Sequence, residues 1–451
     1  MQTKYLIIGA GPCGLGAAWH FNKQNEKNWL IFEKENHAGG LATSFVDKEG
    51  FTWDIGGHVQ FSHYKYFDDV MDEALGEDGW LHHMRSSWVW IKNRFVPYPF
   101  QNNIHRLPEV ERNECLNGLE NLPKNAVLNN FKDWLSASFG EGICKHFLYP
   151  YNFKVWAYDP ALMNYKWIGE RVSVVDIERI KENIKLDRDD VSWGPNNTFK
   201  FPKNGGTGAI WDSVAEKLDQ KKIHFKEELI SLDVEHKVAH FKSGKSVRFE
   251  KLISTIPVDQ LCKKITDDNF QDLKSVSSGL KYSSTHVIGL GLEGQAPESL
   301  ADKCWMYFPE NDSPFYRVTV FSNYSPNNVP DSSKYFSLMA EVSESIDKPV
   351  DKKKVIQETI EGSISSNLMT KDTQIVSAWH LRMEYGYPTP SLERDEILNQ
   401  VIPKLDANDI YSRGRFGGWK YEVSNQDHTF MQGVEWAEMM LSGKKEETYV
   451  L

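Results

Sequence analysis

Residues 4–14 read Lys4-Tyr5-Leu6-Ile7-Ile8-Gly9-Ala10-Gly11-Pro12-Cys13-Gly14, and this stretch decides the fold. Its first part is a short apolar run typical of a strand buried in a parallel sheet. The glycines that follow have the GxGxxG spacing that lets such a strand turn sharply into a helix. Because the helix N-terminus offers unpaired N–H groups and a positive dipole end, the pattern predicts a pyrophosphate site.

The next strand strengthens this interpretation. Trp29-Leu30-Ile31-Phe32 is again apolar, and Glu33 stands at its end. This is about the twenty-residue offset at which a carboxylate accepts hydrogen bonds from the adenosine ribose. Strand, glycines, helix, strand and acid therefore occur in the order of a dinucleotide-binding unit.

Additional glycines favour FAD over NAD. Gly39-Gly40-Leu41 and Gly56-Gly57-His58 allow the backbone to approach a second, bulkier group such as an isoalloxazine ring. A late glycine-rich turn, 414–418, precedes another helix start and is a further candidate flavin contact. The predicted cofactor-binding residues are Gly9, Gly11, Gly14, Glu33, Gly39, Gly40, Leu41, Gly56, Gly57, His58, Arg415, Asn425 and Gln426.

Composition excludes several classes of protein. The 451 residues include 52 Lys and Arg against 63 Asp and Glu, a formal net charge of −11, so no bulk attraction to nucleic acid or anionic membrane is expected. Five scattered cysteines lack the spacing of a metal site or disulfide framework, which favours a reducing compartment and no bound metal. Without a signal-peptide pattern or an apolar run of about eighteen residues, we expect a soluble, cytoplasmic protein.

The order of the patterns predicts interleaved domains. We expect a mixed α/β and α+β fold with a discontinuous, Rossmann-like FAD-binding domain at 1–64, 201–280 and 408–451. Helical periodicity predicts a substrate-binding or lid subdomain at 106–200. Strand patterns predict an antiparallel sheet domain at 65–105 and 281–407.

Longer blocks make the chain resemble a known family, the UDP-galactopyranose mutases, specifically the eukaryotic type. The matching blocks are 56–59, 61–69, 96–103, 150–157, 167–172, 201–202, 205–208, 316–317, 321–326, 386–390, 414–417, 421–423 and 425–428. The resemblance implies an isomerase that interconverts UDP-galactopyranose and UDP-galactofuranose for glycan biosynthesis without net redox change. It also implies that N5 of a reduced FAD displaces UDP from the anomeric carbon, and that NADPH or NADH supplies the electrons.

The resemblance assigns roles to individual residues. Arg317 would hold the diphosphate, because its guanidinium matches two phosphate oxygens. Arg171 and Asn196 would close over the substrate, and His58 would contact the flavin edge with an imidazole that titrates near neutrality. Tyr98, Phe100 and Gln101 would bind uracil. The full predicted substrate set is Phe61, Tyr98, Phe100, Gln101, Asn152, Trp156, Arg171, Asn196, Tyr307, Arg317, Tyr324, Tyr387, Arg415, Tyr421 and Asn425.

Three other classes remain open at this point. A flavin oxidase of the amine or protoporphyrinogen type shares the glycine spacings, although Arg317 and Arg171 suit an anionic substrate better. A GTPase dissociation inhibitor has a related fold without flavin, but the intact glycine turn and Glu33 favour an occupied site. A nicotinamide-dependent epimerase would need a Tyr-x-x-x-Lys pair in a suitable helix, and the sequence offers none.

Overall fold

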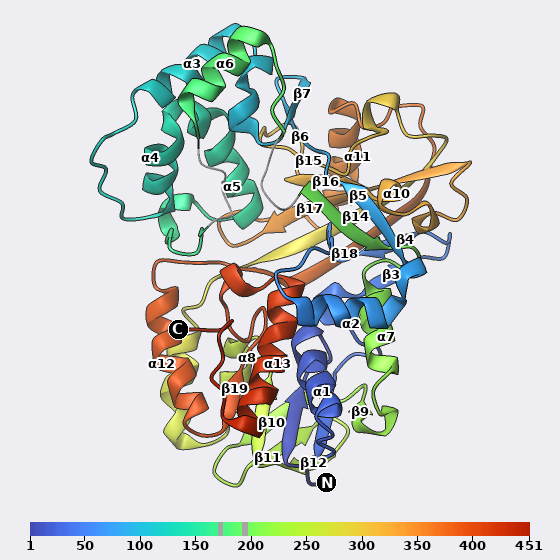
Figure 1. Ribbon diagram of the computed structural model, residues 1–451, viewed down its shortest axis with the longest axis vertical. Coiled ribbons are helices and arrows are strands. Elements are labelled where there is room, and N and C mark those ends of the chain that lie inside the picture. Colours follow the sequence, from blue (N-terminus) through green and yellow to red (C-terminus); the bar gives the residue numbers. More distant parts are fainter. Residues whose placement is uncertain (170–174, 192–196) are drawn as a thin grey trace.

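The computed structural model describes residues 1–169, 175–191 and 197–451. Figure 1 shows a lower nucleotide-binding domain, with a helical subdomain at upper left and a sheet domain at upper right. The predicted Arg171 and Asn196 lie outside the described residues. None of the described helices is long and apolar enough to cross a bilayer.

The lower domain is built on a five-stranded parallel sheet. Its order is β19 (Ile410–Ser412), β13 (Lys251–Ser254), β1 (Tyr5–Ile8), β2 (Trp29–Phe32) and β9 (Ile223–His224). Strands from opposite ends of the chain therefore meet in one sheet, as expected for a discontinuous domain. A three-stranded antiparallel sheet, β10 (Leu229–Asp233), β11 (Val238–Phe241) and β12 (Ser246–Arg248), packs beside it.

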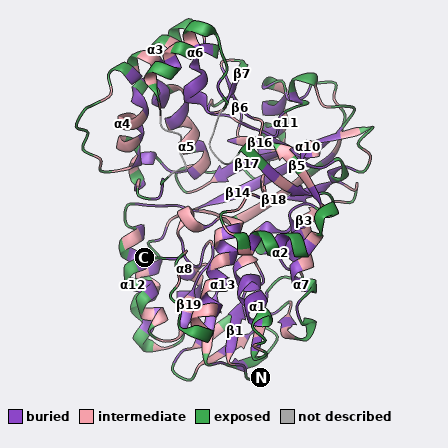
Figure 2. Cartoon of the chain, in the orientation of Figure 1, coloured by how far each residue is buried: buried purple, intermediate pink, exposed green. Residues whose placement is uncertain are grey.

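Helices cover both faces of the parallel sheet, and their buried residues appear purple in Figure 2. On one face, α1 (Pro12–Lys23) packs on α13 (Gln426–Ser442), with α7 (Gly208–Glu216) beside them. On the other face lie α8 (Val258–Lys264), α9 (Gln271–Ser277) and α12 (Arg394–Asp406). The N-terminal ends of α1 and α13 are thereby held close to the carboxyl end of β1, where a dinucleotide binds in such folds.

Two helices differ from the predicted domain boundaries. Helix α2 (Lys65–Leu75) buries Phe67, Val70 and Met71 in the core around α1. Helix α12 buries Ile397, Leu398, Val401, Ile402 and Leu405 on the other face of the nucleotide domain. Both segments fall in ranges predicted for the sheet domain, because an amphipathic period shows that a helix has a buried face but not which core receives it.

The upper sheet has seven strands in the order β18 (Ile375–Pro388), β14 (Tyr282–Glu293), β17 (Tyr335–Glu344), β16 (Arg317–Val320), β15 (Trp305–Tyr307), β6 (Ser87–Ile91) and β7 (Arg94–Pro97). All pairs are antiparallel except β15 with β6, so the sheet predicted as antiparallel contains one parallel pair. Helices α10 (Phe321–Tyr324) and α11 (Val355–Ser365) accompany it. Two short sheets, β3 (Ser44–Val46) with β4 (Thr52–Asp54) and β5 (Trp80–Met84) with β8 (Thr198–Pro202), complete the strands.

The helical subdomain forms its own core. It contains α3 (Glu109–Glu120), α4 (Phe131–Ile143), α5 (Tyr149–Trp156) and α6 (Ile177–Leu186), packed around residues such as Leu135, Phe139 and Phe147. The short helix at Phe100–Arg106, which follows β7, packs into the same core. The helical subdomain is thus tied directly to the sheet that carries Arg317.

Candidate active site

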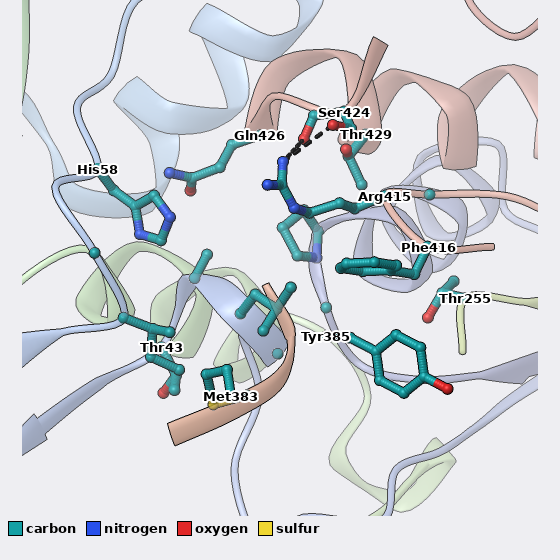
Figure 3. Close-up of a pocket in the computed structure, with 18 of the residues that line it drawn as sticks. Thr43, His58, Thr255, Met383, Tyr385, Arg415, Phe416, Ser424, Gln426 and Thr429 are labelled. Carbon is teal, nitrogen blue, oxygen red and sulfur yellow. Dashed lines mark hydrogen bonds between the residues drawn. The ribbon is translucent and has the colours of Figure 1, made fainter. Parts of the chain in front are cut away.

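A cavity of about 1240 Å³ is lined by residues of both the nucleotide domain and the large sheet. Its volume exceeds the roughly 300–1,000 Å³ of a typical small-molecule pocket, which leaves room for a dinucleotide and a second ligand. Figure 3 shows part of it, with His58 and Gln426 on one side and Tyr385 and Phe416 on the other. The predicted residues that line it are Gly9, Gly11, Glu33, Gly40, Leu41, Gly56, Gly57, His58, Phe61, Arg317, Tyr387, Arg415, Tyr421, Asn425 and Gln426.

The end of the cavity at the β1–α1 turn fits a pyrophosphate. Helix α1 begins directly after Gly11, and its first turn contains no acidic residue that would repel a phosphate. A Cβ atom on Gly14 would lie 2.0 Å from the carbonyl oxygen of Gly9, so only glycine allows this close turn. Gly14 therefore shapes the site from behind and does not line it.

Glu33 is fixed at the end of β2. Its carboxylate accepts hydrogen bonds from the N–H groups of Ala10 and Glu35, both at 2.8 Å. The side chain lines the cavity although only 7% of the residue is exposed. Since a carboxylate has about four acceptor sites, it retains capacity for ribose hydroxyls. Gly39, with φ of +93°, turns the following loop back without lining the cavity itself.

Arg317 is oriented by a carboxylate that the sequence analysis did not single out. Its Nε and Nη2 donate to Oε1 and Oε2 of Glu341 at 2.7 and 2.8 Å. Burial alone would raise the pKa of Glu341, but Arg317, Tyr316 and the Gly57 N–H hold that pKa below its usual value. Both residues line the cavity, and Nη1 of Arg317 has no protein acceptor among the described residues. The guanidinium thus presents its remaining donors to a ligand.

The Gly56–Gly57–His58 turn is held by the same carboxylate. The N–H of Gly57 donates to Oε1 of Glu341 at 3.0 Å, and a Cβ on Gly57 would lie 2.7 Å from the Thr319 hydroxyl oxygen. Burial lowers the pKa of His58 to about 4, helped by Arg317 and Arg415 and opposed by Glu341. The expected titration near neutrality is therefore wrong for this arrangement. Nδ1 of His58 is buried without a partner in the described part of the chain.

Arg415 lies in the centre of Figure 3 and is held by backbone and hydroxyl acceptors. It donates from Nη2 to the Gly386 carbonyl at 3.0 Å and from Nη1 to the Ser424 hydroxyl at 3.0 Å. Its guanidinium carbon lies 4.9 Å from the ring centre of Tyr387 and 5.7 Å from that of Tyr421. A positive charge therefore stands beside two phenols that line the cavity.

The predicted substrate residues form two aromatic groups around Arg317. In one, the Trp156 ring lies 5.7 Å from Tyr387 and 4.8 Å from Tyr421. In the other, Tyr98 and Tyr307 lie 5.2 Å apart, and Arg85 lies over Tyr98 at 5.5 Å. Trp156, Tyr98 and Tyr307 stand behind the residues that line the cavity.

Four predicted substrate residues lie away from the cavity, and three of them are buried. The Phe100 side chain is fully buried against Phe147, with ring centres 4.7 Å apart, so stacking of Phe100 on a base is wrong. Tyr324 is fully buried among Phe199, Phe201 and Phe321, and its hydroxyl has no partner among the described residues. The Asn152 amide donates to its own helix at Leu148, and Gln101 is buried at 4% exposure. None of the four lines the cavity.

Two further residues are linked to the site beyond those predicted: Glu341 lines the cavity, and Tyr151 packs behind the lining against Tyr307. Glu341 was missed because its link to Arg317 arises from the pairing of β16 with β17, where the two residues are direct partners. Tyr151 was missed although it precedes Asn152 in a matching block. Its ring lies 5.2 Å from Tyr307, and burial raises its pKa well above the usual value. The available signal was its position in the matching block 150–157, next to the predicted Asn152.

Comparisons with known proteins agree with this geometry. Residues 7–74 match the family model described as an NAD(P)-binding Rossmann-like domain. The fold is similar to a putrescine oxidase bound to putrescine (14% identity, TM-score 0.63, 98% of this chain and 99% of that chain). It is also similar to a fatty acid isomerase from P. acnes (13% identity, TM-score 0.65, 98% of each chain). At these identities the likeness concerns the fold alone.

One comparison reaches further. The crystal structure of a reduced UDP-galactopyranose mutase has 49% sequence identity and a TM-score of 0.96, and the match covers 100% of this chain and 96% of that chain. Identity of this extent over the whole length includes the helical subdomain and the large sheet as well as the nucleotide-binding unit. The chain therefore belongs to the UDP-galactopyranose mutase family.

Proposed function

We propose that this chain interconverts UDP-galactopyranose and UDP-galactofuranose, and so supplies the furanose form for glycan biosynthesis. The observation that carries the proposal is the full-length 49% identity to a UDP-galactopyranose mutase. A cavity that offers both a dinucleotide site and the cationic side chains of Arg317 and Arg415 supports it. An amine oxidase of similar fold acts on a cation, for which these arginines are unsuitable neighbours.

The cofactor of this reaction is a reduced flavin. Gly9, Gly11 and Glu33 would hold its adenosine diphosphate part, and Gly56, Gly57 and His58 would face its ring system. When bound and reduced, FAD supplies a nucleophilic nitrogen, N5, for the anomeric carbon. The chain itself must then bind the diphosphate, orient the sugar and exclude water.

Arg317 is the proposed diphosphate ligand. Glu341 holds two of its nitrogens, so the remaining donors have a fixed direction before substrate arrives. The hydroxyls of Tyr387 and Tyr421 and the charge of Arg415 would complete the anion site. These groups also stabilise the negative charge that grows on the leaving diphosphate as the anomeric bond breaks.

His58 is proposed to act as a neutral donor at the flavin edge. Its lowered pKa keeps the imidazole uncharged at neutral pH, and its buried Nδ1 needs a partner. A role in orientation of the ring system therefore fits better than a role as a cation. Arg171 and Asn196 are proposed to complete the closed site around the substrate.

The nucleoside is proposed to lie along the segment that follows β7. Tyr98 and Gln101 are the proposed uracil contacts, but neither lines the cavity and Gln101 is 4% exposed, so both side chains would have to shift to reach the base. The buried Phe100 side chain would only support them. Of the remaining predicted substrate residues, Phe61 and Asn425 line the cavity and would face the sugar and phosphates, with Asn152, Trp156 and Tyr307 behind the lining. The fully buried Tyr324 would only support them. The predicted division into three domains, with α2 and α12 moved to the nucleotide domain, belongs to the same proposal.

We also propose that the chain is of the eukaryotic type and that NADPH or NADH reduces it. Arg85 lines the cavity and lies 5.0 Å from the ring centre of Trp305, where it could receive a nicotinamide dinucleotide. Anaerobic stopped-flow measurements of flavin bleaching with NADPH and with NADH test which dinucleotide reduces the flavin. Arg85→Ala should need a higher dinucleotide concentration for the same rate, and an unchanged dependence would remove Arg85 from the proposal.

The activity is tested with purified holoenzyme and UDP-galactofuranose. With dithionite, chromatography should show conversion to the pyranose although no electrons are consumed. Turnover by fully oxidised enzyme in air, or no conversion by a reduced and flavin-loaded enzyme, would contradict the proposed function.

A further inference from the structure

Three side chains gather beside the cavity in a cluster that has no role in the function proposed above: His63, Asp427 and His428. Nδ1 of His63 lies 2.7 Å from Oδ2 of Asp427, and Nδ1 of His428 lies 3.8 Å from the same oxygen. The two imidazole rings stack with centres 4.8 Å apart. Two nitrogen donors and one carboxylate oxygen therefore converge, although His63 is 364 residues away in sequence from Asp427.

The charge balance of Asp427 points to a cation. Only 1% of its side chain is exposed, yet no Lys or Arg in the described part of the chain lies within 4.0 Å of it. Its ion-pair partners there are the two histidines, which carry no charge when unprotonated. Because a buried carboxylate is costly unless it is paired, the cluster has the chemistry to hold a positive ion.

The spacing suits a transition metal. All three ligand atoms lie within 4.8 Å of one another. At metal–ligand distances of about 2.0–2.2 Å, two ligands of a tetrahedral ion lie about 3.3 Å apart. The separations of 2.7 and 3.8 Å to the Asp427 oxygen fall on either side of that value, and the two imidazole nitrogens lie within 4.8 Å of each other. Because the two rings stack at an angle of 25°, the His63 ring must also turn for both nitrogens to face one ion. The His63 side chain is 50% exposed, which allows this adjustment and leaves coordination positions open to water.

The hydrogen-bond partner of His428 can release Nδ1 for a metal ion. The Tyr64 hydroxyl lies 2.8 Å from Nδ1 of His428 and 3.2 Å from the Thr448 hydroxyl. If a metal takes Nδ1, Tyr64 can turn its hydrogen bond fully to Thr448. The phenol therefore remains paired in both states.

We propose that His63, Asp427 and His428 form a binding site for one divalent ion of the zinc class. Two imidazoles and a carboxylate favour Zn²⁺, Ni²⁺ or Co²⁺ over Mg²⁺ or Ca²⁺, which prefer oxygen ligands. The ion would tie the loop that follows His58 to the start of α13, next to Asn425 and Gln426. Bound metal should therefore restrain these two segments, which contribute His58, Asn425 and Gln426 to the cavity lining, and slow turnover.

Equilibrium dialysis of tag-free, FAD-loaded enzyme against ZnCl₂, followed by metal analysis, tests the site. Wild type should bind one zinc ion per chain in saturable fashion. His63→Ala and His428→Phe should each weaken binding by at least about tenfold. The matched control is His236→Ala, because His236 is an exposed histidine 3.0 Å from Asp233 elsewhere on the surface, and it should leave this binding unchanged.

Flavin content and melting temperature establish that each variant is folded before its zinc binding is compared. A wild-type enzyme that retains no more zinc than His63→Ala would overturn the site. Zinc should also slow the reduced wild-type enzyme, and EDTA should restore it. Equal inhibition of wild type and His63→Ala would overturn the proposed restraint of these two segments.

Discussion

Arg317 and Glu341 are direct partners across β16 and β17. Both carboxylate oxygens of Glu341 accept hydrogen bonds from the Arg317 guanidinium, at 2.7 and 2.8 Å. The same carboxylate accepts from the N–H of Gly57 at 3.0 Å. One buried acid thus orients the proposed diphosphate ligand and the turn beside the flavin together. A shift of the Arg317 guanidinium or of the Gly57 turn would therefore displace the Glu341 carboxylate and, through it, the other group.

Replacement of Arg317 should impair both binding and bond cleavage. A charge-assisted, bidentate contact in a closed site is worth roughly 2–4 kcal/mol, so Arg317→Ala should lower kcat/KM by about 30- to 1000-fold. Arg317→Lys should recover only part, because an ammonium cannot span two oxygens. Steady-state kinetics on enzyme of known flavin content measure this. Loss of FAD with near-normal kcat/KM per flavin would move the diphosphate role to Arg171 or Arg415.

Glu341→Gln should destabilise the free enzyme more than the UDP complex. The substitution leaves the buried Arg317 charge without its partner, a loss of up to about 3–5 kcal/mol. A diphosphate can replace that partner, so UDP should raise the melting temperature of the variant more than that of wild type. Glu344→Gln is the matched control, because Glu344 also pairs with an arginine, Arg382, but does not line the cavity. Equal UDP-induced shifts in Glu341→Gln and wild type would contradict the proposed exchange.

The lowered pKa of His58 predicts a pH effect of known sign. Between the unfolded value of 6.5 and the folded value of about 4, the unfolded chain binds a proton that the folded chain excludes. Stability therefore rises with pH across this window and is lost as pH falls from 6.5 through 4. In the flavin-free protein, His58→Gln should show a shallower fall in melting temperature from pH 7 to 4.5. Identical slopes for variant and wild type would show that His58 protonates freely in the fold.

The parts of the fold that could be predicted are those coded by neighbouring residues. The β1–α1 turn is an example, because the apolar run, the glycines and Glu33 lie within thirty or so residues and act through local backbone geometry. The domain against which α2 and α12 pack could not be predicted, because an apolar helix face does not specify which core it contacts. The parallel pair β6 and β15 was missed for a similar reason, since strand partners far apart in sequence leave no local signal.

In the candidate site, too, features set by neighbouring residues could be predicted and contacts between distant residues could not. Arg317 was identified from its block, but its orientation depends on Glu341, 24 residues further on in another strand. The sequence could suggest aromatic contacts for Phe100 and Tyr324, whereas only the packing shows that both side chains have no exposed surface. His63 and Asp427 meet only in the folded chain, so spacing rules for metal ligands do not detect them.

The last prediction separates the nucleotide site from the core that supports it. If Tyr98 and Gln101 contact uracil, UDP should compete with substrate at least about tenfold better than ADP, because adenine does not fit a site built for the pyrimidine edge. Gln101→Ala should reduce this preference and leave the flavin in place. Phe100→Ala should instead cost about 3–5 kcal/mol of folding stability, because it opens a cavity beside Phe147. Competition assays and denaturant unfolding distinguish the two effects. Equal inhibition by UDP and ADP would show that the base binds elsewhere than this segment. If Phe100→Ala kept wild-type stability but bound UDP more weakly, Phe100 would contact the ligand directly.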